Sequence, residues 1–170
     1  MKKFIPLSTP TIGENEMKYL KECLDTAWLS SAGKFVELFE QRISDYTKSE
    51  NSIACMNGTS ALHTSLILAG VGIDDEVIVP SLTFIAPVNA IKYVGAEPIF
   101  MDSKEDFNID IEKTIDFIKN ETRLVADKNS DKPLTINKSS NKRVSAIIVV
   151  HIFGNVVLLD DLVEICNERN

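Results

Sequence analysis

Residues 57–60 have the composition of a phosphate-binding turn. Their sequence, Asn-Gly-Thr-Ser, follows the apolar run 53–56 and opens a helix-like stretch. Glycine lets a bulky anion approach the backbone, and the unpaired N–H groups at the start of a helix carry partial positive charge. The turn therefore predicts an anion site made by Gly58, Thr59 and Ser60. Asn, Ser and Thr also cap helices that bind nothing, so a simple helix cap is the alternative.

The overall composition is that of an ordinary globular domain. The chain has 170 residues, of which 44% are hydrophobic and 25% are charged, and its formal net charge is −7. This is enough apolar material for one sizeable core. Because the chain is acidic and its basic side chains are scattered, nothing indicates a nucleic-acid partner. No apolar run has the length of a signal-peptide core or a membrane span, which predicts a cytoplasmic protein without membrane contact.

Histidine and cysteine spacing predicts no metal site. The two histidines, His63 and His151, lack the spacing of zinc ligands. The three cysteines are odd in number and far apart, and they lie on apolar faces of the predicted elements. Buried free thiols are therefore expected rather than disulfides, at Cys23, Cys55 and Cys166.

The periodicity of apolar residues predicts the scaffold that must position the turn. Two amphipathic helices are expected near residues 17–28 and 35–46, and from residue 52 onward strand-like and helical runs alternate four times. The strand-like runs are almost continuously apolar, which is typical of strands covered on both faces. The predicted fold class is α/β, with a mostly parallel sheet and helices on both faces. The expected strands are 53–56, 76–79, 98–101 and 145–150, and the expected helices after them are 59–69, 84–94, 110–119 and 158–168.

Polar and aromatic residues follow the expected strands at their carboxyl ends, where parallel sheets bind ligands. Phe84 follows the second expected strand and His151 follows the fourth. The segment 121–143 is too polar for a core, so it is predicted as an exposed excursion that could include a hairpin through residues 134–136.

Six motifs occur in a characteristic order along nearly the whole chain. They occupy residues 28–34, 39–40, 57–62, 75–84, 95–98 and 151–154. Their order and spacing resemble the DegT/DnrJ/StrS family of sugar aminotransferases. Within that family, segments 4–8 and 84–93 are most similar to the branch that aminates nucleotide-linked 4-keto-6-deoxy sugars on the way to legionaminic acid or bacillosamine-type sugars.

The resemblance implies a fold-type-I scaffold that binds pyridoxal 5′-phosphate. It places the cofactor phosphate at Gly58, Thr59 and Ser60. It also implies that Phe84 stacks on the pyridine ring, where a core aromatic would otherwise be the natural interpretation. His151 would form a hydrogen bond near the cofactor or its acidic partner, although a histidine after a strand is often structural.

The same resemblance suggests substrate contacts near the first two helices. Trp28, Ser30 and Ser31 would border the sugar site. A tryptophan that ends an amphipathic helix is usually a core residue, which is the alternative for Trp28.

The resemblance also implies that this is the amino-terminal part of an aminotransferase. Residues 1–50 would form an amino-terminal helical segment, and residues 51–170 the first part of the cofactor-binding large domain, with a polar insertion at 121–143. The Schiff-base lysine and the carboxylate that pairs with the pyridine nitrogen would lie beyond residue 170. No catalytic residue is therefore assigned within the chain, which is expected to be inactive alone.

The complete enzyme implied by the resemblance would be a homodimer with its sites at the subunit boundary. It would transfer an amino group, with L-glutamate as donor, to a nucleotide-linked keto sugar. One alternative is a phosphate- or nucleotide-binding α/β module, although the chain has neither Gly-x-Gly-x-x-Gly nor Gly-Lys-Ser/Thr. Another is a non-catalytic interaction protein, which only the missing lysine favours.

Overall fold

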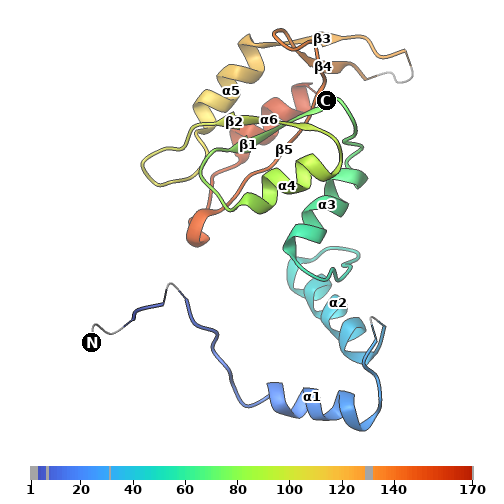
Figure 1. Cartoon of the computed structure of the whole chain (residues 1–170). Helices are drawn as coiled ribbons and strands as arrows, with labels where there is room; N and C mark the ends of the chain where they lie inside the picture. Colours follow the sequence, from blue (N-terminus) through green and yellow to red (C-terminus); the bar gives the residue numbers. More distant parts are fainter. Residues whose placement is uncertain (1–3, 7, 31, 129–131, 170) are drawn as a thin grey trace. The chain divides into compact units, whose positions relative to one another are not determined.

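The computed structural model describes residues 4–6, 8–30, 32–128 and 132–169 (Figure 1). The chain divides into two compact units, Met1–Ala54 and Cys55–Asn170. None of the helices in the described ranges is long and apolar enough to cross a bilayer.

Helices α1 (Glu16–Asp25) and α2 (Lys34–Thr47) belong to the first unit and confirm the two predicted amphipathic helices. The rings of Tyr19 and Phe35 join them, with centroids 5.1 Å apart. Helix α1 ends earlier than its apolar pattern predicts, because the chain turns into a left-handed conformation at Ala27 (φ 56°).

A parallel three-stranded sheet in the order β2-β1-β5 forms the centre of the second unit. Its strands are β1 (Glu76–Pro80), β2 (Glu97–Met101) and β5 (Val144–Ile147). Ile78 lies opposite Ile99 on one side and Ile147 on the other. Strand β1 is buried along its whole length, as the continuous apolar run predicts for a strand with neighbours on both sides.

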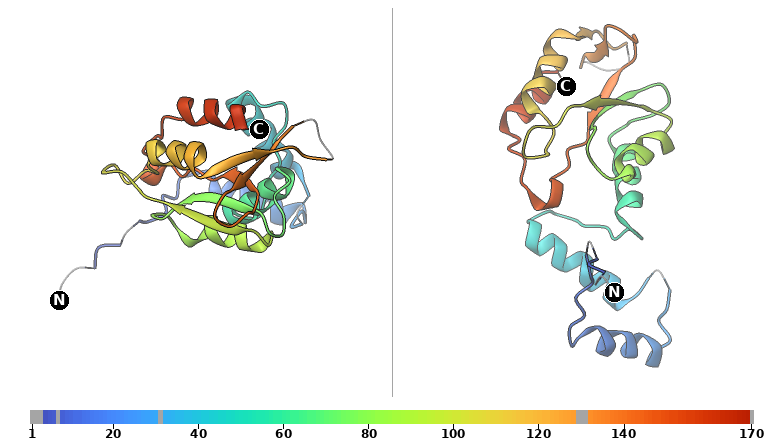
Figure 2. Two further views of the ribbon diagram at one scale, coloured as in Figure 1. Left: turned by 90° about the horizontal axis from the view of Figure 1, so that it is seen from above. Right: turned by 60° about the vertical axis from the view of Figure 1, so that its left-hand side comes forward.

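Different helices cover the two faces of the sheet, as the views in Figure 2 show. Val77 and Val79 face one core, which α3 (Gly58–Leu68) and α4 (Ile85–Tyr93) cover. Ile78 faces the other, which α5 (Ile111–Asn120) and α6 (Asp160–Arg169) cover. Because successive side chains of a strand point to opposite faces, this alternation confirms the predicted sheet with helices on both sides.

The predicted strand 53–56 is wrong. These residues belong to no strand, and Ile53 and Met56 are exposed. Apolar residues predict an extended run, but a strand also needs a neighbour for its backbone groups, and none of the described strands supplies one. Cys55 is consequently exposed rather than buried, whereas Cys166 is half-buried and burial raises the pKa of its thiol. Cys23 is also half-buried, and all three thiols are free.

The polar segment 121–143 forms an antiparallel hairpin of β3 (Thr122–Val125) and β4 (Leu134–Asn137), which confirms the hairpin expected through residues 134–136. It is less exposed than its composition predicts. Asn137 is buried and donates a 2.8 Å hydrogen bond to the carboxylate of Glu76 at the start of β1. Polar side chains can be buried when their hydrogen bonds are satisfied, so this pair attaches the hairpin to the amino end of the sheet.

Candidate functional site

The turn at 57–60 both caps α3 and leaves donors free. The side-chain oxygen of Asn57 accepts the N–H of Ser60 at 2.9 Å, so the helix-cap alternative is realised. Among the hydrogen bonds of the described residues, none uses the N–H of Gly58 or Thr59. These two N–H groups lie at the positive end of an 11-residue helix, where an anion is stabilised.

Gly58 leaves open space at this helix end. A Cβ atom added there would meet no heavy atom within 4 Å, and its φ is outside the left-handed region. The glycine is therefore not needed for an unusual backbone conformation, and its lack of a side chain leaves room for a ligand. Thr59 and Ser60 are half-buried beside it, so their hydroxyls could add to the donors.

Phe84 lies four residues beyond the end of β1 and precedes the first residue of α4. Its side chain is 81% exposed, so the core-aromatic alternative is wrong. An exposed aromatic ring at the carboxyl edge of a parallel sheet is available to stack on a flat ligand.

His151 lies at the same edge as Phe84. The pairing of β5 with β1 continues through the Ile148 N–H, which donates to the carbonyl of Ile78 at 2.8 Å, and His151 follows three residues later. Because β1 and β5 are parallel neighbours, Phe84 and His151 both follow strands at one edge of the sheet. Figure 1 shows the start of α4 and the short 3₁₀ helix η1 (Ile152–Gly154) at this end.

The hydrogen bonding of His151 defines which tautomer its neutral ring adopts. Its ring is exposed, and Nδ1 accepts the N–H of Val157 at 3.0 Å. A nitrogen that accepts cannot carry the proton, so the neutral ring carries it on Nε2. His151 can therefore donate one hydrogen bond from Nε2 to a ligand. The other histidine, His63, packs edge-on against Tyr93 of α4 at 5.7 Å, which is the packing role expected of a helix-interior position.

Asp102 follows β2 at the same edge but is already paired with a lysine. Its carboxylate forms a 2.6 Å ion pair with Lys113, and this hydrogen-bonded ammonium lowers the pKa of the carboxyl. Asp102 is therefore poorly suited to bind an anion or to act as a base at neutral pH.

Sequence reasoning missed Asn108, which lies in the segment after β2. Its side chain is 3% exposed, and its oxygen accepts the N–H of Ile152, directly after His151, at 3.3 Å. The available signal was an asparagine two residues before the expected helix 110–119.

In the first unit, Trp28 and Ser30 line a hollow of about 340 Å³ together with Glu22 and Lys34. Trp28 is 60% exposed, so the core alternative for this residue is wrong. Lys34 donates to Glu22 at 2.5 Å, and this carboxylate raises the pKa of the ammonium. Ser31, the third predicted substrate residue, lies outside the described residues.

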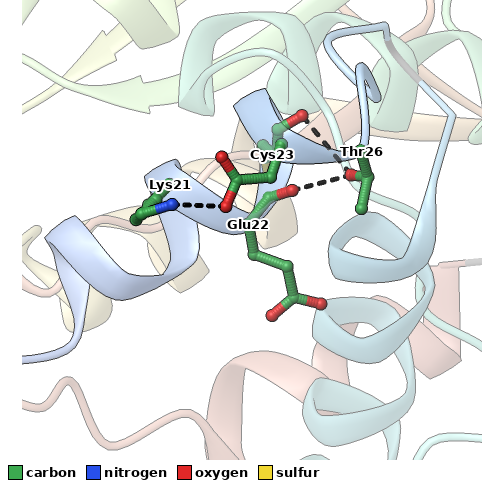
Figure 3. A network of polar contacts seen from close by, with 5 residues as sticks. Lys21, Glu22, Cys23 and Thr26 are labelled. Carbon is green, nitrogen blue, oxygen red and sulfur yellow. Dashed lines mark hydrogen bonds and ion pairs between the residues drawn. The ribbon is translucent and has the colours of Figure 1, made fainter.

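The wall of this hollow is held by short-range contacts at the end of α1, which Figure 3 shows. The hydroxyl of Thr26 donates to the carbonyl of Glu22 at 2.7 Å and lies 3.4 Å from that of Cys23. These contacts fix the carboxyl end of the helix and so the position of the chain that leads to Trp28.

A family comparison matches residues 10–170 to the DegT/DnrJ/EryC1/StrS aminotransferase family. Curated relatives include the GDP-perosamine synthases of Caulobacter vibrioides and Escherichia coli O157:H7, each 36% identical to this chain. The alignments cover 98% and 99% of the chain but 39% and 40% of those proteins. The chain therefore spans about 40% of the length of these relatives.

Solved structures of similar fold include aminotransferases. One from Psychrobacter cryohalolentis is 26% identical with a TM-score of 0.75, over 97% of this chain and 37% of that one. The pyridoxal-phosphate form of a sugar aminotransferase from Streptococcus pneumoniae is 28% identical with a TM-score of 0.71, over 95% of this chain and 36% of that one. These likenesses confirm the predicted fold, that of the fold-type-I aminotransferases.

Proposed function

Because the chain belongs to the DegT/DnrJ/EryC1/StrS aminotransferase family, we propose that it is the amino-terminal part of a pyridoxal-phosphate-dependent sugar aminotransferase. The complete enzyme would move an amino group from L-glutamate to the keto carbon of a nucleotide-linked 4-keto-6-deoxy sugar. The observation that carries the proposal is the start of α3, where Gly58 leaves room for a phosphate beside two N–H groups unused among the described residues.

The chemistry of four residues supports sites for the phosphate and the ring of the cofactor. The N–H groups of Gly58 and Thr59 would bind the phosphate, with the hydroxyls of Thr59 and Ser60 as further donors. The exposed ring of Phe84 would fix the tilt of the pyridine ring. The Nε2–H of His151 would donate a hydrogen bond at the same edge of the sheet. When bound, the cofactor supplies an electron-accepting ring for amino transfer.

We propose that Trp28, Ser30 and Ser31 border the sugar site. The exposed indole of Trp28 and the nearby Ser30 line one hollow. This supports a place beside the sugar for two of the three residues. The relatives named as GDP-perosamine synthases support a nucleotide-linked sugar as the substrate class. The legionaminic acid or bacillosamine branch stays a prediction, as do the cytoplasmic location and the choice of L-glutamate.

We also propose that the complete enzyme is a homodimer. The second unit exposes several large apolar side chains, and these would be covered by further chain or by a partner subunit. They include Met56, Leu68, Ile73, Phe153 and Leu158.

The 170-residue chain by itself is expected to be unable to transfer amino groups. Two lysines near the sheet are already paired with carboxylates. Lys92 donates a hydrogen bond to Glu97 at 2.7 Å, and Lys104 donates one to Glu112 at the same distance. A lysine that carries the cofactor must instead be free to reach its aldehyde carbon. Incubation with pyridoxal phosphate and then borohydride should therefore give no stoichiometric adduct, as measured by intact mass and peptide mapping.

Trace labelling spread over several surface lysines is the background expected from the reagent. The proposal places the lysine that carries the cofactor outside this chain. One fully reduced adduct at a single lysine of the chain would contradict it. Failure of the chain to bind the cofactor phosphate at all would favour the non-catalytic alternative, and binding of nucleotides without the cofactor would favour the nucleotide-binding module.

A further inference from the structure

Two side-chain contacts tie the segment that carries His151 to the segment after β2. The side-chain oxygen of Asn108 accepts the N–H of Ile152 at 3.3 Å. The side-chain amide of Asn155 donates to the carbonyl of Asp106 at 3.2 Å. The residues joined are more than 40 positions apart in sequence, so these bonds fix the loop by tertiary rather than local structure.

The amide of Asn108 is itself held in one orientation. It is 3% exposed, and its Nδ2 donates to the carboxylate of Asp106 at 3.0 Å. The second oxygen of the same carboxylate accepts the backbone N–H of Asn108 at 3.1 Å. Hydrogen bonds to an ionised acceptor are stronger than neutral ones, so the amide oxygen is directed at Ile152 and cannot readily rotate away.

The loop adopts a conformation that needs such support. Phe153 has a left-handed backbone (φ 51°), which a non-glycine residue rarely adopts without surrounding constraints. At the far end of the loop, the side chain of Val157 is buried in the core under α6. This burial holds the backbone N–H of Val157 in place. The backbone nitrogen of Val157 lies 3.0 Å from Nδ1 of His151, across the loop that contains η1.

We infer that Asn108 is a positioning residue for His151. By holding Ile152, it keeps Nδ1 of His151 on the N–H of Val157, so that the proton of the neutral ring stays on Nε2, the nitrogen left to face a ligand at the carboxyl edge. The identity of that ligand rests on the function proposed above, whereas the hydrogen-bond arrangement does not. Among the hydrogen bonds of the described residues, none joins Asn108 to the ring of His151, so Asn108 acts on the ring through the backbone N–H of Ile152.

The test is the tautomer of His151, read by two-bond ¹H–¹⁵N NMR on the chain above the ordinary pKa of histidine, about 6.5. The wild-type chain should show the Nε2–H form in large excess. Asn108→Leu keeps the approximate shape of the side chain but removes both the oxygen that accepts the N–H of Ile152 and the NH₂ group that donates to Asp106. The excess of the Nε2–H form should fall about tenfold, as expected when one supporting hydrogen bond is lost.

Asn120→Leu is the matched control. Asn120 also donates its side-chain amide to a carboxylate, that of Asp116, but it lies on the exposed surface of α5. This variant should leave the His151 tautomer unchanged. A folded Asn108→Leu chain that keeps the wild-type tautomer ratio would overturn the inference, because a merely structural asparagine would not move this signal.

If Asn108→Leu does not fold, amide exchange in the wild-type chain decides. The N–H groups of Ile152 and Val157 should exchange together and slowly. Free exchange at Ile152 with protection at Val157 would overturn the inference. Adding pyridoxamine 5′-phosphate to the same samples separates the two proposals. If the wild-type chain has the expected tautomer but its His151 signal does not change, the result counts against the cofactor site alone. If the wild-type chain has a mixed tautomer, the result counts against the role of Asn108 alone.

Discussion

Gly58→Asp should weaken the binding of pyridoxamine 5′-phosphate by roughly 30-fold. Two unit charges about 4 Å apart repel by about 4 kcal/mol at an effective dielectric constant of about 20, and we take half of this because the turn is open to solvent. The Cβ of the new residue enters open space, so no clash accompanies the charge. An Asp in the first turn of a helix is favourable for the fold, so stability should not fall.

Gly58→Asn is the matched control because it has the same shape without the charge. It should weaken binding only by the loss of space, and much less than Gly58→Asp. Affinity is measured by NMR titration of the amide signals, and folding by circular dichroism. Equal affinities for the Asp and Asn variants would contradict an anion site at the start of α3.

Ile78→Ala should lower the free energy of unfolding by about 3 kcal/mol. Ile78 is 0% exposed in the central strand, and its side chain packs with residues of α5 and α6. Removing a fully buried isoleucine loses its transfer free energy and leaves a cavity that the sheet cannot close, because β1 is hydrogen-bonded on both sides. Such a loss is a large part of the usual stability of a domain, about 5–15 kcal/mol.

Urea denaturation followed by circular dichroism measures this effect. Ile73→Ala is the control with the same change at an 82% exposed position, and it should alter stability by less than about 0.5 kcal/mol. Similar midpoints for the two variants would show that the two-sided core around β1 does not govern stability.

The sheet and its covering helices were predictable because they depend on local periodicity. The continuous apolar run at β1 and the helical spacing on each side require a buried parallel strand, and the structure has it. The run 53–56 shows the limit of this reasoning. Its composition is equally apolar, but strand formation depends on a neighbour that no local pattern reveals.

The candidate site was predictable to the level of residue type and position. The residues after β1 and β5 could be named because parallel strands end at one edge, and the turn at 57–60 because its residue types are those that begin a helix. The exposure of Phe84, the proton position of His151 and the buried Asn108 could not. Each depends on contacts between segments far apart in the chain, such as the bond between Asn108 and Ile152.

The central claim is that the N–H groups at the start of α3 bind the cofactor phosphate while Phe84 covers its ring. Titrating the ¹⁵N-labelled chain with pyridoxamine 5′-phosphate tests it most directly. The account predicts the largest amide shifts at Gly58 and Thr59 and a ring-current shift at Phe84. Shifts confined to the amino edge of the sheet, near Glu76 and Asn137, with none at Gly58 and Thr59, would contradict it.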